Sequence, residues 1–381
     1  DTVGLTFSGV GGAVGVGDHG LVLARVLGSV RPEVDLYLLD DCRPEDVVSD
    51  PAASGLRRVF YEVEEPLEIH LAILEGVDER YRTPYFDNLK KYAQKPIGTF
   101  HALPIARGKS VFRSDWIRDM GEFYGPTLFL AESSATTGGL DSLLEPTGNI
   151  KLAQDAAARA FGADKVFFVT NGTSTSNKMV YQALCQPGDI VIVDRNCHKS
   201  HHYGCVLAGA QPYYVEAFPL TAYSMYGSVP LRTIKKALLD LKAAGRLDKV
   251  RMIALTNVTF DGHMYDTRRV MEECLAIKPD LVFMWDEAWF GFGRFNWMYR
   301  RRTAMGARQE ITAWFADPRS LEAYLEQEKT LGADLDPADP RLLDARLVPD
   351  PRVARIRVYQ TNSTHKSMSS LRQGSMVLVG D

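Results

Sequence analysis

From about Leu128 onward, the chain alternates short apolar runs with longer amphipathic segments. Most of the runs are apolar at nearly every position, which is typical of strands buried on both faces of a sheet. The longer segments repeat apolar residues at intervals of three or four, as helices that cover a sheet do. The predicted strands are Lys165–Val169, Ile190–Val193, Tyr213–Val215, Met252–Leu255, Leu281–Trp285 and Ile356–Tyr359, and the predicted helices are Asn149–Phe161, Ser174–Leu184, His198–Leu207, Leu231–Ala244 and Thr267–Ile277.

This alternation predicts a three-layer α/β domain, in which a mainly parallel sheet has helices on both faces. In such a sheet, ligands bind beyond the carboxyl ends of the strands. We therefore expect the functional residues in the segments that directly follow the predicted strands.

The pattern divides the chain into three regions. Residues 1–63 suggest a small α/β unit with a strand at Val34–Leu39, residues 64–127 a linker with short helices interrupted by prolines, and residues 128–381 the main domain. Within the main domain, residues 300–354 are charged and contain prolines. We expect them to form an insertion with one helix at Ser320–Lys329.

Composition narrows the class of protein without identifying it. The chain has 381 residues, 45% of them hydrophobic, and a net charge of −4. This charge gives no electrostatic reason to expect nucleic acid or an anionic membrane as a partner, and no apolar run approaches the roughly 18 residues of a membrane span. The five cysteines are odd in number and scattered, which favours reduced thiols in a cytoplasmic protein.

A lysine follows the last predicted strand, in the tetrapeptide Ser363-Thr364-His365-Lys366. A lysine amine with a lowered pKa can form a Schiff base with an aldehyde. The neighbouring hydroxyls and the imidazole can hold an anion such as a phosphate. By itself the tetrapeptide also fits an ordinary surface lysine after a strand, so the other segments decide between the two interpretations.

Two further strand ends carry residues that suit a phosphorylated pyridine. After Val169, the sequence Thr170–Asn177 combines a glycine, hydroxyl residues and a helix start, where backbone amides bind anions, although plain helix capping gives similar sequences. After Trp285, Asp286 can pair with a protonated pyridine nitrogen or simply cap the next segment. The small side chain of Ala288 leaves room for a flat ring.

The segment Asp194–Cys205 contains two cysteines and three histidines. A zinc site is one interpretation, but no second ligand cluster follows in the sequence, which argues against it. A histidine at this strand end can instead stack on an aromatic cofactor. A turn at Thr256–Gly262 follows another strand and can line the same pocket.

Together, the segments TNGTSTSNK, DRNCHKS, WDEAW and STHKS resemble, in this order, the major domain of the ornithine/lysine/arginine decarboxylase family. Residues 104–109 and 138–144 also match the family's pattern at the start of that domain. The similarity extends from about Tyr81 to the end of the chain. Enzymes of this family have fold type I and use pyridoxal 5'-phosphate.

The resemblance implies roles for eight residues and no metal site. Lys366 would bond covalently to the cofactor's aldehyde, Asp286 would pair with the pyridine nitrogen, and His198 would stack on the ring. Trp289 would lie close to the site. The residues around the phosphate would be Thr173, Ser174, Ser363 and His365.

Some features depart from the family pattern. Residues 300–354 are longer than in the shorter bacterial members, and the chain stops at Asp381, where further strands and a C-terminal domain follow in the family. The chain also begins without a methionine, so we expect a fragment of a longer protein whose own activity is doubtful. The first 63 residues match, more weakly, a partial receiver-like wing domain used for assembly.

A dinucleotide-binding pattern near the N-terminus competes with this interpretation. Gly15–Gly20 fits G-x-G-x-x-G, and Asp40 stands about 20 residues further on. However, the preceding segment Gly9–Val14 is rich in glycine and a poor strand, which argues against nicotinamide binding.

We therefore predict a pyridoxal phosphate-dependent decarboxylase of lysine, ornithine or arginine that assembles as a homodimer or larger homo-oligomer. The substrate amine would displace Lys366, and His365 or a tyrosine would protonate the substrate after carbon dioxide leaves. One alternative is another fold type I reaction, such as transamination or retro-aldol cleavage. Another is a non-catalytic assembly role on a decarboxylase scaffold.

Overall fold

The structure is a computed structural model that describes residues 18–30, 34–41, 43–50, 53, 55–61, 63–98, 100, 103–132, 140–332 and 335–381. The chain divides into two compact units, Asp1–Lys95 and Pro96–Asp381. The division falls inside the predicted linker, residues 64–127, so the helices of that segment are shared between the two units.

The first unit contains a parallel pair of strands, β1 (Leu36–Asp40) and β2 (Leu56–Tyr61). In the sequence, helix α1 (Asp18–Val30) precedes β1, and helix α2 (Pro44–Val48) lies between the two strands. The predicted strand at residues 34–39 overlaps β1. Of the G-x-G-x-x-G match, residues 15–17 lie outside the described residues, and residues 18–20 begin α1. The small core of this unit consists of Leu21, Val47, Ala53 and Val59.

Two helices complete this unit, α3 (Pro66–Tyr81) and α4 (Pro84–Gln94). With 16 residues, α3 is longer than the prolines led us to expect. Pro66 and Pro84 each stand in the first turn of a helix, where the missing N–H has no intrahelical acceptor to lose. These prolines therefore begin helices and do not interrupt them.

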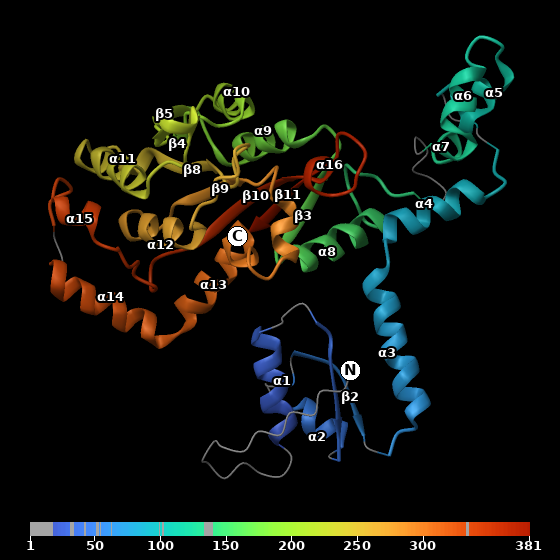
Figure 1. The fold of residues 1–381 in the computed structure, drawn as a ribbon, viewed down its shortest axis with the longest axis horizontal. Coiled ribbons are helices and arrows are strands. Elements are labelled where there is room, and N and C mark those ends of the chain that lie inside the picture. Colours follow the sequence, from blue (N-terminus) through green and yellow to red (C-terminus); the bar gives the residue numbers. More distant parts are fainter. Residues whose placement is uncertain are drawn as a thin grey trace. The chain divides into compact units, whose positions relative to one another are not determined.

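The second unit is built on a seven-stranded sheet with the order β3-β11-β10-β9-β8-β4-β5 (Figure 1). Strand β11 is antiparallel to both of its neighbours, and the other pairs are parallel. Each predicted strand is present, and the predicted three-layer α/β class is confirmed. The strands are β3 (Lys165–Val169), β4 (Ile190–Asp194), β5 (Gln211–Val215), β8 (Val250–Thr256), β9 (Val282–Asp286), β10 (Arg357–Ser363) and β11 (Ser375–Gly380), and a small hairpin is formed by β6 (Pro219–Leu220) and β7 (Met225–Tyr226).

The helices predicted between the strands are present, with ends shifted by about one residue. His198 was expected to be the first residue of a helix, but it is the N-cap residue that precedes α10. The helices of this unit are α5 (Lys109–Arg113), α6 (Arg118–Tyr124), α7 (Pro126–Leu130), α8 (Asn149–Phe161), α9 (Thr173–Leu184), α10 (Lys199–Ala208), α11 (Leu231–Ala243), α12 (Thr267–Ile277), α13 (Ala304–Ala316), α14 (Pro318–Leu331), α15 (Pro340–Asp344) and α16 (Thr364–Ser367).

Alternate residues of each central strand enter two separate apolar cores, because successive side chains of a strand point to opposite faces. In β9, Val282 and Met284 pack with α9 and α10, whereas Phe283 and Trp285 pack with α12 and α13. The sheet is therefore covered on both faces, which explains why its strands are apolar at every position.

Residues 300–354 differ from the expected insertion with a single helix. They contain α13, α14 and α15. Helix α14 corresponds to the predicted helix at Ser320–Lys329, and α13 and α15 were both missed. Met305, Ala307 and Ile311 of α13 are buried in the core under the sheet. The expectation of one helix is wrong because the arginines at 300–302 and the charged residues after α13 made the whole region resemble a surface insertion, although α13 itself is mostly apolar.

A buried ion pair joins α11 to α12. Lys235 Nζ lies 2.7 Å from Glu273 Oε2 and also donates to the carbonyl of Ala345, and both charged side chains are almost inaccessible to solvent. Glu273 has a second partner, since Arg269 Nε donates to its Oε1 at 2.7 Å. Glu273 therefore keeps a positively charged partner, Arg269, if Lys235 is removed, whereas Lys235 loses the carboxylate that it is paired with if Glu273 is removed.

Replacing Glu273 with alanine is expected to lower the free energy of unfolding by about 3–5 kcal/mol, because it leaves the Lys235 ammonium buried without a counter-charge. Lys235→Met is expected to cost less, since Arg269 still pairs with Glu273. Urea unfolding of both variants and of the double variant Lys235→Met/Glu273→Leu measures this. Equal costs for the two single variants would contradict the prediction.

Candidate active site

The four segments that carry the sequence motifs meet at one cavity of about 780 Å³. The cavity lies where β3, β4, β8, β9 and β10 end, which is the ligand-binding edge of a parallel sheet. The turn at residues 256–262, predicted to line the pocket, contributes Thr256, Thr259, Phe260 and Asp261. The wall of the cavity includes all eight predicted site residues: Thr173, Ser174, His198, Asp286, Trp289, Ser363, His365 and Lys366.

Asp286 points to the α9 and α10 side of the sheet because it has the same parity in β9 as Val282 and Met284. Its Oδ2 accepts hydrogen bonds from Asn177 Nδ2 at 2.9 Å and from His201 Nε2 at 3.1 Å. Its Oδ1 accepts the backbone N–H of Ala288 at 3.0 Å.

These bonds determine the charge of Asp286. Burial by itself raises the pKa of this carboxyl. The hydrogen bonds from His201, Asn177 and the backbone N–H of Ala288 outweigh burial and hold the pKa below its ordinary value. Asp286 is therefore a carboxylate in a nearly solvent-free position. Such a group can pair with a protonated pyridine nitrogen.

His198 is tied to the same network. Its Nδ1 accepts the backbone N–H of Ser200 and lies 2.8 Å from the Ser200 hydroxyl. That hydroxyl accepts a hydrogen bond from Asn177 Nδ2 at 2.9 Å, and Thr361 fixes the amide of Asn177 by donating to its Oδ1. Burial lowers the pKa of His198, which favours the neutral ring. One amide side chain thus connects the two residues predicted to bind a ring.

Thr173 and Ser363 face each other in a buried group of hydroxyls. Thr173 Oγ1 is hydrogen-bonded to Ser363 Oγ and lies 2.9 Å from Ser375 Oγ. Ser375 in turn contacts Ser176 and donates to the carbonyl of Asn362. Two of the three hydroxyls predicted to surround a phosphate therefore also connect α9 to β10 and β11.

The start of α9 offers further donors. Gly172 has a φ of 73°, a backbone conformation suited to glycine, and its N–H donates to the carbonyl of Gln373. Ser174 is exposed at this helix start, and in the described structure no side chain caps the helix. Free amides and a hydroxyl at a helix N-terminus suit a phosphate.

Lys366 is exposed on α16, directly after β10. Its Nζ lies 4.4 Å from the ring centroid of Trp289, a cation–π contact. Trp289 also makes an edge contact with Phe260. The amine is thus at the cavity wall and accessible to a ligand.

His365 has a defined tautomer. Its Nδ1 donates to the carbonyl of Gly374 at 2.8 Å, which leaves Nε2 as the nitrogen that can exchange a proton. No tyrosine belongs to the described wall of the cavity. Of the two proton donors considered from the sequence, only His365 is therefore present there.

The cysteine and histidine segment does not gather into a metal site. Over the described ranges, no three side chains of the His, Cys, Asp and Glu types form a group that could hold an ion. Burial raises the pKa of Cys197 to about 12 and that of Cys205 to about 11, so both are neutral thiols.

Glu287, the residue after Asp286, points to the opposite face of the sheet. Its Oε1 accepts hydrogen bonds from Asn257 Nδ2 at 2.8 Å and from the backbone N–H of Ala304 at 2.7 Å. Its Oε2 is buried and has no hydrogen-bond partner among the described residues. Burial raises the pKa of Glu287 to about 8, so this carboxyl is protonated at neutral pH.

Glu287→Gln is expected to change how stability depends on pH. Because the pKa of Glu287 rises from 4.5 to about 8 on folding, its contribution to stability is complete below pH 4.5 and is lost as the pH rises through 8. The variant lacks this loss and should gain roughly 3–5 kcal/mol relative to the natural protein between pH 5 and pH 8.5. Urea unfolding at both pH values measures the change, and the exposed Glu326→Gln serves as control.

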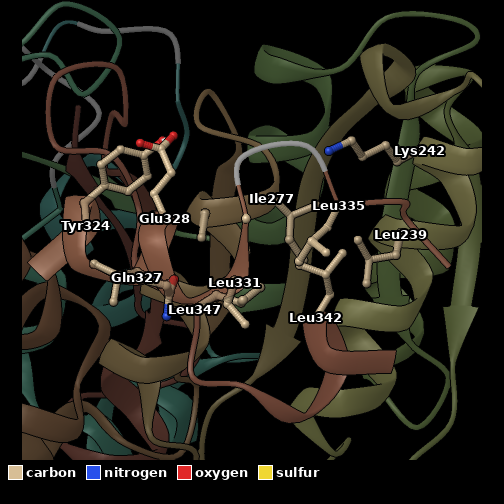
Figure 2. A pocket seen from close by; sticks show the side chains of 13 residues that line it. Leu239, Lys242, Ile277, Tyr324, Gln327, Glu328, Leu331, Leu335, Leu342 and Leu347 are labelled. Carbon is tan, nitrogen blue, oxygen red and sulfur yellow. The ribbon is translucent and has the colours of Figure 1, made fainter. Parts of the chain in front are cut away.

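A second cavity, of about 160 Å³, lies among α11, α12, α14 and α15 and shares no residue with the first. Figure 2 shows leucine side chains around it, with Tyr324 and Glu328 at one end and Lys242 at the other. Tyr324 donates to Glu328 at 3.0 Å. None of the predicted site residues lies in this cavity.

Several residues of the site were missed in the sequence. Asn177, His201 and Tyr181 are buried around Asp286, although none of them was assigned a role. A signal for them exists, because Thr173, Asn177 and Tyr181 recur every four residues and so share the core-facing side of α9.

The sheet order, the motif residues at one cavity and the ionised Asp286 define this unit as a fold type I domain, the class of pyridoxal phosphate-dependent enzymes. The chain belongs to the Orn/Lys/Arg decarboxylase family, whose major-domain model matches residues 83–316. Enzymes of this family are carboxy-lyases that use pyridoxal phosphate.

Relatives of this family are similar along much of the chain. Lysine decarboxylase LdcA of Pseudomonas aeruginosa is 27% identical over 390 residues, which cover 97% of this chain and 46% of the relative. The inducible ornithine decarboxylase of Escherichia coli is 33% identical over 64% of this chain and 34% of its own length. The biodegradative arginine decarboxylase of Escherichia coli is also 33% identical, over 59% of this chain and 31% of its own length.

Solved structures support the same fold. Lysine decarboxylase A of Pseudomonas aeruginosa superposes with a TM-score of 0.61 at 26% identity and covers 95% of this chain and 44% of that protein. The constitutive lysine decarboxylase of Escherichia coli gives a TM-score of 0.60 at 22% identity, over 96% and 45%, which supports the fold alone. The chain thus spans less than half the length of these relatives, and they carry the names of three different substrates.

Proposed function

We propose that the protein, at full length, decarboxylates a basic amino acid, either lysine, ornithine or arginine, to the corresponding amine and carbon dioxide. One observation carries the proposal: residues from four distant segments, among them a buried carboxylate and an accessible lysine, line one cavity at the carboxyl edge of the sheet. Membership in the Orn/Lys/Arg decarboxylase family supports the reaction class.

The residues of the cavity fit pyridoxal phosphate. Lys366 is the amine that would bond to its aldehyde, and Asp286 the anion that would pair with its ring nitrogen. His198 offers a neutral ring for stacking, and the small Ala288 leaves space beside Trp289. Around the phosphate we place Ser174 and His365, the free amides at the start of α9, and the paired hydroxyls of Thr173 and Ser363.

When bound, pyridoxal phosphate supplies the electron-poor ring that accepts the electron pair left behind by carbon dioxide. The residues of the chain would bind and orient the cofactor and the substrate and would transfer the protons that the reaction requires. Asp286 would supply a negative charge to the ring nitrogen, and Lys366 would hold the cofactor until the substrate amine takes its place. His365, through Nε2, is the residue we propose to deliver the proton to the substrate carbon.

We also infer a homodimer or larger homo-oligomer and a cytoplasmic location. Beside the cavity, the segment Trp289–Met298 exposes large apolar side chains, including Trp297 with 76% of its surface accessible, and Phe260 is 84% exposed. Patches of this kind mark association surfaces. No helix of the described ranges is long and apolar enough to cross a membrane, and the described cysteines are free thiols.

The test is an assay of amine and carbon dioxide release by the full-length protein with lysine, ornithine and arginine, each supplied with pyridoxal phosphate. We expect release of both products in equal amounts from one of the three. Formation of a keto acid without carbon dioxide would replace decarboxylation by transamination. Absence of any product, with pyridoxal phosphate unbound, would favour an assembly role.

A further inference from the structure

We propose that His201 is a positioning residue for the reaction: held by Tyr181, it fixes the Asp286 carboxylate in orientation and charge for a ring nitrogen. The inference rests on the proposed binding of pyridoxal phosphate. It adds a residue that does not line the cavity and that the sequence motifs left without a role.

The contacts form a continuous line behind the cavity. His201 Nε2 lies 3.1 Å from Asp286 Oδ2, and His201 Nδ1 lies 3.2 Å from the hydroxyl of Tyr181. The two rings meet edge to face, with centroids 5.8 Å apart. His201 is 1% exposed and Tyr181 is fully buried, so neither nitrogen of the imidazole has water as an alternative partner.

The direction of these bonds follows from the chemistry of the partners. Burial raises the pKa of Tyr181 well above its ordinary value, so its hydroxyl is neutral and can donate to His201 Nδ1. Because a carboxylate can only accept, the contact with Asp286 requires a proton on His201 Nε2. Asn177 Nδ2 lies 3.2 Å from the same nitrogen and directs its own N–H groups to Asp286 and Ser200. The hydrogen bond to Asp286 is charge-assisted, and such bonds are stronger than neutral ones.

Close packing of α9 against α10 sets this geometry. Gly204 lies one turn after His201 on α10, and a Cβ atom there would come within 2.7 Å of the Tyr181 ring. A glycine at this position therefore lets the two helices approach until the tyrosine hydroxyl reaches the histidine.

The other donor to the same oxygen does not replace His201. Asn177 Nδ2 donates to Asp286 Oδ2 and also to the hydroxyl of Ser200. Without His201, the buried Oδ2 would keep one shared, neutral donor. Burial would then favour the protonated acid, and a protonated Asp286 cannot accept the N–H of a pyridinium ring as an anion.

The experiment compares two ligands of the full-length protein. Pyridoxal phosphate carries the ring nitrogen, whereas its 1-deaza analogue has carbon in that position and otherwise the same aldehyde and phosphate. We expect the natural protein to bind pyridoxal phosphate more tightly than the analogue. In His201→Leu this ratio of Kd values should fall about tenfold, because a charge-assisted hydrogen bond no longer holds Asp286 ionised. His201→Gln, whose amide can still donate, should keep most of the ratio.

Two further variants serve as a control and as an independent test. His202→Leu, at the next position of α10, removes a histidine that contacts Tyr214 and Cys197, makes no contact with Asp286 and does not itself line the cavity. It should leave the ratio unchanged. Tyr181→Phe removes the hydroxyl that orients His201 and should lower the ratio in the same direction, with the ring packing retained. It also provides the measurement if His201→Leu does not fold, as judged by circular dichroism.

The outcomes separate the two proposals. If the natural protein distinguishes the ligands and the ratio is unchanged in folded His201→Leu and Tyr181→Phe, the role of His201 is refuted while the cofactor site stands. An equal loss of affinity for both ligands would also refute it, because it would indicate a general structural role. If the natural protein binds neither ligand, the proposed function fails, and the role of His201 with it.

Discussion

Replacing Lys366 with alanine is expected to abolish the visible absorbance that the full-length protein gains with pyridoxal phosphate. Lys366 supplies an accessible amine at the cavity, and alanine cannot bond to the aldehyde. Amine release should fall at least about 10³-fold, within the range that single positioned groups supply. Absorbance spectra and the amine assay measure both effects. Borohydride reduction of the natural protein should label this position.

Lys178 provides the matched control, because it is a second lysine in the wall of the same cavity. Lys178→Ala should retain the absorbance and the borohydride label. If Lys366→Ala kept its absorbance and Lys178→Ala lost it, the assignment of the reactive amine would be wrong.

Asp286→Asn is expected to reduce amine release by about 10²–10⁴-fold and to weaken the binding of pyridoxal phosphate. The three donors around Asp286 are arranged for a carboxylate, and the amide of asparagine carries no charge to pair with a protonated ring nitrogen. Steady-state kinetics and cofactor titration of the full-length protein measure the change, with circular dichroism as a check of folding.

Asp261 is the corresponding control, since it lines the same cavity on the turn after β8. We expect Asp261→Asn to change cofactor affinity much less than Asp286→Asn does. Equal effects of the two substitutions would indicate that only the total charge of the cavity matters.

The architecture could be predicted from the sequence because the central strands are buried on both faces. Runs such as Ile190–Val193 and Leu281–Trp285 are apolar throughout, and amphipathic helices separate them, which together indicate a parallel sheet between two helical layers. The residues at the strand ends could be found as well, since the topology of a parallel sheet places them at one edge.

The support behind the cavity could not be predicted in the same way. Whether His201 reaches Asp286 depends on how closely α10 approaches α9, which is a matter of packing between helices and not of spacing along the chain. Periodicity identifies a core-facing position, but a polar residue such as Asn177 in that position has several possible partners. Only the three-dimensional arrangement selects one of them.

The lengths and number of helices in residues 64–127 and 300–354 were predicted incorrectly for a different reason, which concerns prolines and charged residues. Pro66 favours the first turn of a helix and disfavours its interior, and the sequence around it does not distinguish the two. Helix α13 follows directly on the arginines at 300–302, and its place in the core is clear only when the sheet that it covers is known.

Asp286 and Glu287 point to opposite faces of the sheet, so the number of residues in β9 determines which of the two acids faces the cavity. One strand position separates an acid that is ionised from an acid that keeps its proton. A single-residue deletion within β9 would turn every later side chain to the other face and bring the neutral acid toward the cavity. Such a deletion, which leaves both acids in the chain, should be as damaging as the loss of Asp286 itself.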